Sequence, residues 1–457
     1  MDHSKQLGEG SIGRLLLKFS VPAIVGMTVN ALYNIVDRIF VGRGVGSLAI
    51  AGTTIGFPIM LIIMAFSMLV GMGATSLISI RLGEKKKEDA ELIAGNAMLL
   101  LIILSLVLSI LGLLFLAPLL KLFGASNAVL PYASDYMKII LLGTVLSGIS
   151  FGMNNFIRAE GNPRIAMFTM IIGAVSNVIL DYCFIFILSL GIKGAALATV
   201  ISQGISAVWV LYYFFGGKSF LKIHWKNLKL KLLVMQQIFT IGFPPFAMQL
   251  VNSVQQLILL KSLGIYGGDL AIAAMGIIFS ISTILVMPVI GISQGAQPII
   301  GYNYGAREYK RVKETLKSAI VAATLIVLIG FIITRLFPEA IVALFAKNDM
   351  QLIAMGSHAL LTFFLFLPFI GMQIIGSTYF QSVGKPKQAT ILTLSRQILL
   401  FIPALLILPQ FWGLEGVWRT APLADLGSFI LTGVWLLYEL KHLDLSEVSP
   451  GECNTPA

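Results

Sequence analysis

Charge is scarce in this chain of 457 residues, of which only 12% are Asp, Glu, Lys or Arg. Ordinary soluble domains carry roughly twice that share. Hydrophobic residues make up 57% of the chain, and the mean hydropathy is +0.91. Their runs are long and unbroken, which predicts helices of about 20 residues that cross a membrane. We therefore expect an all-α polytopic membrane protein, since lipid offers no partner to unpaired backbone groups.

Motifs of enzyme chemistry are also lacking. The two cysteines, Cys183 and Cys453, indicate neither a disulfide framework nor a metal site, and the four histidines do not cluster. No Walker motif, H-E-x-x-H pair or nucleophile elbow occurs. The polar start, MDHSKQLGEGS, does not have the layout of a cleavable signal peptide. These absences argue against an enzyme and against a bound cofactor.

The chain repeats itself after 222 residues. Pro22, Asn30 and LAIAG (48–52) recur as Pro244, Asn252 and LAIAA (270–274). Twelve spans are predicted, six in each copy, and an even number gives both copies the same orientation. We expect two six-helix lobes related by a pseudo-twofold axis along the membrane normal. The predicted spans lie at about 14–41, 54–80, 91–117, 131–157, 164–189, 193–215, 234–262, 275–300, 314–337, 355–380, 388–408 and 415–440.

Basic residues gather on one side of these spans. Most of the 32 Lys and Arg, including Arg158 and Arg164, fall in the loops of that side. The positive-inside rule places this side, with both termini, in the cytoplasm. The net charge of +11 is then topological, and it indicates no nucleic-acid partner.

Four parts follow along the chain: an N-lobe at 1–215, a cytoplasmic linker at 216–233, a C-lobe at 234–440 and a polar, disordered tail at 441–457. The linker reads GGKSFLKIHWKNLKLKLL. Its alternation of lysines with apolar residues suggests a segment that lies on the anionic inner leaflet.

Two carboxylates lie deep within predicted spans, Asp37 in the first and Asp181 in the fifth. An ionisable group inside a span is a functional-site hypothesis by default, and a structural hydrogen-bonded acid is the alternative. At about 1.5 Å per residue, both acids and Thr199 fall in the outer half of the membrane. Asn30 and Asn177 share the helix faces of Asp37 and Asp181. We expect these five polar groups to converge.

The second copy of the repeat lacks both acids, because Leu259 and Ala404 stand at the equivalent positions. Ion coupling is therefore expected to depend on the first lobe. Arg396 and Asp425 fall near the midplane of the last two spans. We interpret them as a buried ion pair, with a substrate-contacting charge as the alternative.

Over nearly its whole length the sequence resembles the MATE (multidrug and toxic compound extrusion) transporters, and most closely their MepA-like bacterial exporters. The matching motifs are P-x14-D-x3-VG-x8-AG from Pro22, RLGE after the second span, NNFIRAEGNPR closing the fourth and SNVILD in the fifth. The resemblance implies a central cavity, no cofactor, and drug export coupled to inward H⁺ or Na⁺. It also implies a first-lobe cation cluster of Asn30, Asp37, Asn154, Asn177, Asp181 and Thr199.

We therefore predict a secondary active multidrug exporter of the bacterial inner membrane, a monomer among membrane lipids. Its substrates would be amphipathic, cationic small-molecule drugs or dyes, and its coupling ion H⁺, or Na⁺ held at Asp37 and Asp181. Polar or flexible side chains of the spans are candidates for the substrate cavity: Asn34, Asn252, Gln256, Met287, Gln294 and Gln373. A flippase for lipid-linked saccharides, which would need a basic cavity, and a non-transporting receptor are the alternatives.

Overall fold

The computed structural model describes residues 5–223, 227–346 and 349–448, and these ranges are almost entirely helical, with no strand. The helices of the first half are α1 (Lys5–Glu9), α2 (Ile12–Gly44), α3 (Ser47–Gly83), α4 (Lys87–Leu114), α5 (Leu116–Leu122), α6 (Leu130–Leu142), α7 (Thr144–Ala159), α8 (Pro163–Asp181), the π-helical η1 (Tyr182–Ile187) and α9 (Gly191–Phe215). Those of the second half are α10 (Leu232–Gly305), α11 (Tyr309–Leu336), α12 (Pro338–Ala346), α13 (Met350–Phe363), the 3₁₀-helical η3 (Leu367–Phe369), α14 (Ile370–Ser382), α15 (Pro386–Leu394), the π-helical η4 (Ser395–Phe401) and α16 (Ile402–Val448).

Breaks within the long helices explain how these elements make twelve spans. By length and hydropathy, the described residues contain eight spanning helices, and the bent pairs α6–α7 and α13–α14 raise the number to ten. One of the eight, the stretch Pro386–Lys441, breaks at Gly413 and so holds two spans. α10 breaks at Gly268, where φ is 65°, and its part before the break, 232–267, is long enough to cross a membrane as well. Both breaks are in the left-handed region that favours glycine. The predicted twelve-helix membrane fold is confirmed.

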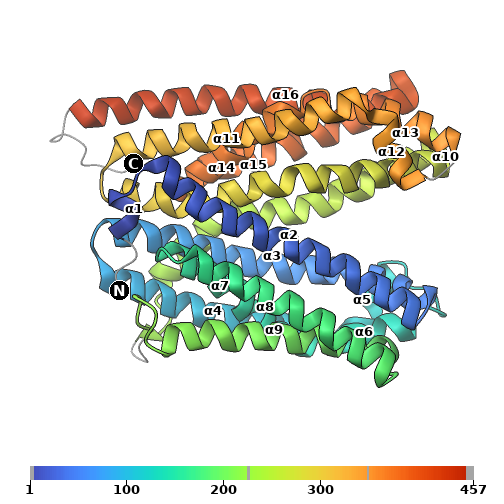
Figure 1. The fold of residues 1–457 in the computed structure, drawn as a ribbon, viewed down its shortest axis with the longest axis horizontal. Coiled ribbons are helices and arrows are strands. Elements are labelled where there is room, and N and C mark those ends of the chain that lie inside the picture. Colours follow the sequence, from blue (N-terminus) through green and yellow to red (C-terminus); the bar gives the residue numbers. More distant parts are fainter. Residues whose placement is uncertain (1–4, 224–226, 347–348, 449–457) are drawn as a thin grey trace.

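The helices form two lobes that lie side by side (Figure 1). α2 to α9 make the N-lobe, and α10 to α16 make the C-lobe. α1 and the last turns of α16 lie at the same end of the molecule (Figure 1). We call this end, which includes the loops at 84–86 and 306–308, the basic end. That it faces the cytoplasm stays a prediction.

Near the basic end, glycines bring α3 and α10 into backbone contact. A β-carbon added at Gly83 would lie 1.9 Å from the carbonyl oxygen of Tyr302, and one at Gly305 would lie 2.1 Å from that of Ile80. Gly305 and Tyr302 stand 222 residues after Gly83 and Ile80, so the two contacts are copies of each other. Any side chain would push the helices apart. The repeat thus forms a symmetric seam, which we define by these four residues.

The first part of the linker is held by the N-lobe, and the prediction that its apolar residues lie on the membrane is wrong for Leu221 and Ile223, which are buried. Leu230, Leu232 and Leu233 are exposed, and for them it stays a prediction. Leu221 is fully buried in the N-lobe core. The backbone N–H groups of Phe220 and Leu221 donate to the Glu160 carboxylate at 3.0 and 3.1 Å, and that of Lys222 donates to Glu91 at 3.0 Å. Residues 224–226 lie outside the described ranges. The described lysines of the linker are exposed: Lys218, Lys222, Lys229 and Lys231.

Two further expectations need correction. α16 continues to Val448, so the tail predicted from Lys441 is helical over 441–448, and 449–457 lie outside the described residues. Arg158, counted with the loop charges, is only 5% exposed. It is buried because α7 continues to Ala159 and presents the guanidinium to Gln294 of the C-lobe.

Candidate functional site

The two carboxylates of the membrane spans meet inside the N-lobe. Asp37 lies on α2, and Asp181 ends α8 where the helix widens into the π-helical turn η1, a feature frequent at functional sites. α2 packs along α8, and each carboxylate acts electrostatically on the other. Asp181 is fully buried and Asp37 is partly buried. The structure therefore places both acids in one interior site, formed by helices that are distant in sequence.

Amide and hydroxyl groups line this site. Asn177, one turn before Asp181 on α8, donates its Nδ2 hydrogen to Thr199 Oγ1 of α9 at 3.5 Å. Thr199 in turn donates to the carbonyl of Ala195 at 3.1 Å. Asn177 and Thr199 are both buried. The pairing brings α8 and α9 together beside the acids, as the sequence led us to expect.

Two tyrosines that the sequence analysis missed also belong to the site. Tyr136 of α6 forms a hydrogen bond with Thr199 and interacts electrostatically with both carboxylates. Tyr33 of α2 also interacts electrostatically with both. Tyr33 lies four residues before Asp37 and so on the same helix face, a signal that could have revealed it. Tyr136 carries no such signal, because only the packing of α6 brings it to the acids.

Most of the carboxylate oxygens of the two acids have no hydrogen-bond partner among the described residues. Both oxygens of Asp181 and one oxygen of Asp37 are buried without a hydrogen-bond partner in the part of the chain that the structure describes. Arg38 follows Asp37 in the chain, but it is exposed and lies 5.7 Å from the centre of the Phe57 ring. Two neighbouring buried carboxylates cannot both stay ionised cheaply. The arrangement therefore suits reversible binding of a proton or a small hard cation.

Asn30 and Asn154 are less closely tied to the acids. Asn34 donates to the backbone carbonyl of Asn30 at 2.7 Å and to its side chain at 3.3 Å, a bond within α2. Asn154 of α7 is buried with its Oδ1 atom unpaired among the described residues. Neither side chain forms a hydrogen bond with Asp37 or Asp181 in the described chain.

The C-lobe has apolar side chains at the positions equivalent to the two acids. Leu259 is 1% exposed and Ala404 is 7% exposed. Arg396 and Asp425 form the ion pair predicted between the last two spans, with Nε and Oδ1 2.7 Å apart and the Asp425 side chain 3% exposed. Because this carboxylate already has a cation on a neighbouring span, it does not need a mobile ion.

The predicted cavity residues do not form one cluster. Asn252 accepts a hydrogen bond from Gln397 at 3.2 Å within the C-lobe, and Gln294 accepts one from Arg158 across the lobes. Gln373 is buried. The other three are more open: Asn34 and Gln256 are exposed, and Met287 is partly buried.

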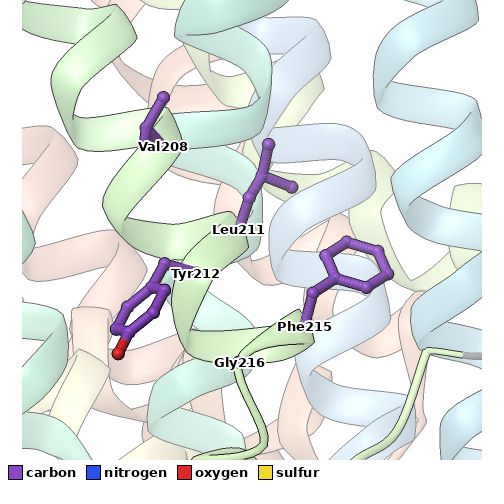
Figure 2. A pocket seen from close by; sticks show the side chains of 5 residues that line it. All are labelled: Val208, Leu211, Tyr212, Phe215 and Gly216. Carbon is purple, nitrogen blue, oxygen red and sulfur yellow. The ribbon is translucent and has the colours of Figure 1, made fainter.

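Two shallow hollows lie away from all these residues. One, of about 450 Å³, is on the outside of α9 beside Val208, Tyr212 and Phe215 (Figure 2). The other, of about 380 Å³, is at the basic end between α3 and α10 and includes Arg81 and Gln236. Neither is lined by a predicted cavity residue, so neither identifies the substrate path.

Comparison with known proteins agrees with the repeat and the fold. The sequence profile of the MatE family matches the chain twice, over residues 22–183 and 244–406, so that each match begins at one of the repeated prolines. The multidrug export protein MepA of Staphylococcus haemolyticus is 30% identical over 434 residues, which are 95% of each chain. A solved structure of the MATE multidrug transporter DinF-BH, described as a complex with a small molecule, is 43% identical, with 95% of this chain and 97% of that chain covered and a TM-score of 0.88. A MATE family transporter in an outward-facing conformation is 26% identical, with 96% and 98% covered and a TM-score of 0.90.

Twelve spans in two lobes define the class as a multi-pass membrane transporter rather than an enzyme. Within that class, the chain belongs to the MATE family.

Proposed function

We propose that this protein is a secondary active multidrug efflux transporter that exchanges amphipathic, cationic organic compounds for inward H⁺ or Na⁺ by alternating access. Its relatives support the substrate class, since one is named a multidrug export protein and another is described as a multidrug transporter in complex with a small molecule. The single observation that carries the coupling is the interior pair Asp37 and Asp181, of whose four oxygens three are buried without a hydrogen-bond partner in the described chain.

The acids would act as the ion-sensing element. A proton or Na⁺ that enters the site neutralises part of the paired charge, with Asn177, Thr199 and the two tyrosines as neighbouring hydrogen-bonding groups. One charge that crosses 100 mV releases about 2.3 kcal/mol, but a monovalent drug cation that leaves in exchange costs the same amount. In a one-for-one exchange the concentration gradient of the ion therefore supplies the energy, about 1.4 kcal/mol for each tenfold gradient, whereas a second ion per drug molecule would add the electrical term.

α2 is the element that would transmit the change. It holds Asp37 near one end and Pro22 near the other. Proline lacks the N–H group that would bond the preceding turn, which makes this part of the helix easier to bend. We infer that ion binding at Asp37 bends α2, displaces drug from the cavity, and is reversed when the ion leaves on the inner side.

The decisive experiment is dye efflux from vesicles in which a pH gradient and a Na⁺ gradient are imposed separately. We expect one gradient to drive efflux by the wild-type protein and Asp37→Asn to abolish it, with normal amounts of folded protein in the membrane. Asp135→Asn is the matched control, because Asp135 is partly exposed and pairs with Lys193 at 3.4 Å. Efflux that responds to neither gradient, or that survives Asp37→Asn, would overturn the proposal.

The alternative of a saccharide-lipid flippase finds less support. Such a protein needs free cations for a pyrophosphate, and Arg396, the chief midplane cation of the sequence, is engaged by Asp425. We further propose that the exporter works in the bacterial inner membrane as a monomer surrounded by lipids, without nucleic acid. Light scattering of the detergent-solubilised protein measures its molar mass and would test whether it is a monomer.

A further inference from the structure

The segments that precede the first span of each lobe share an unusual arrangement. α1 leads into α2 of the N-lobe, yet it is gripped by the C-lobe. The linker leads into α10 of the C-lobe, yet it is gripped by the N-lobe. Both segments lie at the basic end, where the seam holds α3 against α10.

The grip on α1 comes from two C-lobe side chains. Asn303 of α10 donates to the carbonyl oxygen of Leu7 at 2.9 Å. Arg311 of α11 donates to the same oxygen at 3.1 Å and to that of Gly10 at 2.6 Å. Leu7 is fully buried in a small apolar cluster with Ile299 of α10 and with Ile12, Leu15 and Phe19 of α2. α1 is thus fastened to the C-lobe through its backbone, and its Leu7 side chain packs where the two lobes meet.

The other attachment of α1 is to the N-lobe. Gln6 donates to the carbonyl oxygen of Gly161, in the turn between α7 and α8, at 2.8 Å, and it accepts a hydrogen bond from Lys18 of α2. A β-carbon added at Gly8 would touch the Tyr302 ring at 3.1 Å. Tyr302 is a member of the seam, so α1 lies directly over the contact between the lobes.

The linker mirrors this arrangement on the other lobe. Glu160 and Glu91 accept its backbone N–H groups near Leu221, and Asn96 of α4 accepts that of Lys231 at 2.8 Å. Asn96 also donates to the carbonyl of Asn227 at 3.4 Å. Each lobe therefore holds the lead-in segment of the other through groups that bond to its backbone.

We propose that α1 and the linker are paired clasps that keep the basic end closed, and that Arg311 must release α1 whenever the lobes part there. The proposal rests on the alternating access proposed above. Arg311 bonds α1 only through neutral carbonyls. Water at the surface replaces such bonds easily, whereas breaking a buried ion pair would leave an unpaired charge. This chemistry fits a contact that opens and closes in every cycle.

Distance measurement between spin labels tests the clasp without substrate or gradient. Labels at Glu88 and Lys310, exposed positions 222 residues apart at the start of α4 and α11, report the separation of the lobes at the basic end. They would be placed in a chain whose Cys183 and Cys453 are replaced by alanine. We expect Arg311→Gln to raise the ratio of open to closed distances about ten-fold, as loss of charge-assisted bonds predicts.

Arg307→Gln is the matched control, because Arg307 is exposed in the neighbouring loop and its replacement removes the same charge without touching α1. It should leave the distances unchanged. Gln6→Ala, at a partly exposed position, should raise the ratio about three-fold, as for one neutral hydrogen bond. The double variant of Gln6 and Arg311 should match Arg311→Gln alone, since the Gln6 bond no longer links the lobes once α1 has left the C-lobe.

The clasp is overturned if Arg311→Gln and Gln6→Ala both leave the distances as in wild type, or if Arg307→Gln has the same effect as Arg311→Gln. Fully additive effects in the double variant would also contradict it. Because the readout needs no transport, failure of the export proposal would show in the efflux assay and not in these distances.

Discussion

The two lobes are copies of one plan, and they differ most in how their interiors are filled. The described core of the C-lobe is one apolar cluster that runs from Leu259 to Leu443 and also takes in Leu16 of α2. The N-lobe has two larger clusters, one near the basic end around Phe156 and one near the opposite end around Tyr136, and α1 and α2 contribute most of a further small one. At the positions of Asp37 and Asp181 the C-lobe has the buried side chains of Leu259 and Ala404. A polar pair has replaced apolar side chains at these positions in one copy only.

The lobes also differ in how they treat a buried acid. In the C-lobe, Asp425 is neutralised by Arg396, a cation that is part of the protein. In the N-lobe, both oxygens of Asp181 are without a protein donor in the described chain. A fixed partner gives a permanent structural pair, whereas a missing partner creates a place for a mobile ion. The comparison teaches that the function follows from the asymmetry, because the shared plan alone provides only a scaffold.

The largest effect on export should come from replacing Asp181, the buried acid without a protein donor among the described residues. Asp181→Asn should reduce dye efflux to background, because the remaining carboxylate can no longer share an ion with a second one. Asp135→Asn, outside the site, should keep wild-type efflux at equal expression. If Asp181→Asn exports normally, the N-lobe site is structural and the contrast between the lobes loses its functional meaning.

Breaking the ion pair of Arg396 and Asp425 in the C-lobe should lower the stability of the protein and leave export in place. Asp425→Leu should lower the free energy of unfolding by about 3 kcal/mol, because Arg396 is left as an unpaired charge. Replacing both residues by leucine should recover most of that loss and should retain export. Thermal unfolding in detergent, combined with efflux, measures both. Loss of export in the stable double variant would show that the pair contacts substrate.

Removing one neighbour of the acids should have an intermediate effect. Tyr136→Phe deletes the hydroxyl that bonds to Thr199, and we expect efflux to fall about five-fold, as for one lost neutral hydrogen bond. Tyr132→Phe on the same helix is the control, because Tyr132 packs against the apolar cluster at this end and, in the part of the chain that the structure describes, forms no hydrogen bond with Thr199. Equal efflux by the two variants would place Tyr136 outside the coupling site.

The smallest effect should be a pH dependence of stability at the basic end. Burial raises the pKa of Glu160, between α7 and α8, above its ordinary value, and hydrogen bonds from Tyr213, Ser219 and the linker backbone offset this only in part. The folded state therefore binds the proton more tightly than the unfolded state, so stability falls as pH rises from the ordinary carboxyl range toward the raised pKa. Glu160→Gln should flatten this part of the dependence of the unfolding temperature on pH. If the unfolding temperature of Glu160→Gln changes with pH as steeply as that of the wild type, Glu160 is not the group responsible.

Much of this architecture follows from the sequence because membrane physics leaves few choices. Twelve apolar stretches, the repeat from Pro22 to Pro244, and the loss of Asp37 at Leu259 can all be recognised without coordinates. The pair of Asp37 and Asp181 was also predictable, since depth within a helix follows from counting residues. Hydropathy and spacing are local properties, and local properties can be read from a chain.

Contacts between distant segments could not be predicted in that way. Tyr136 joins the acids only because α6 packs against α9, and Leu221 and Ile223 of the linker are buried in the N-lobe core where lipid was expected. In the sequence Arg158 cannot be told apart from a loop arginine, but in the structure it is buried against Gln294. Charge and hydropathy do not reveal which surface covers a residue.

By itself, the sequence determined that the chain spans a membrane twelve times, repeats its plan, and has Asp37 and Asp181 in the first half with apolar residues at the equivalent positions of the second, because these depend on residue type and spacing. The tertiary structure alone decided that the acids share one site in which Asp181 has no protein donor among the described residues, that Arg396 engages Asp425, and that each lobe holds the segment leading into the other. Those facts depend on distances between segments far apart in the chain, and only the packing of whole helices sets such distances.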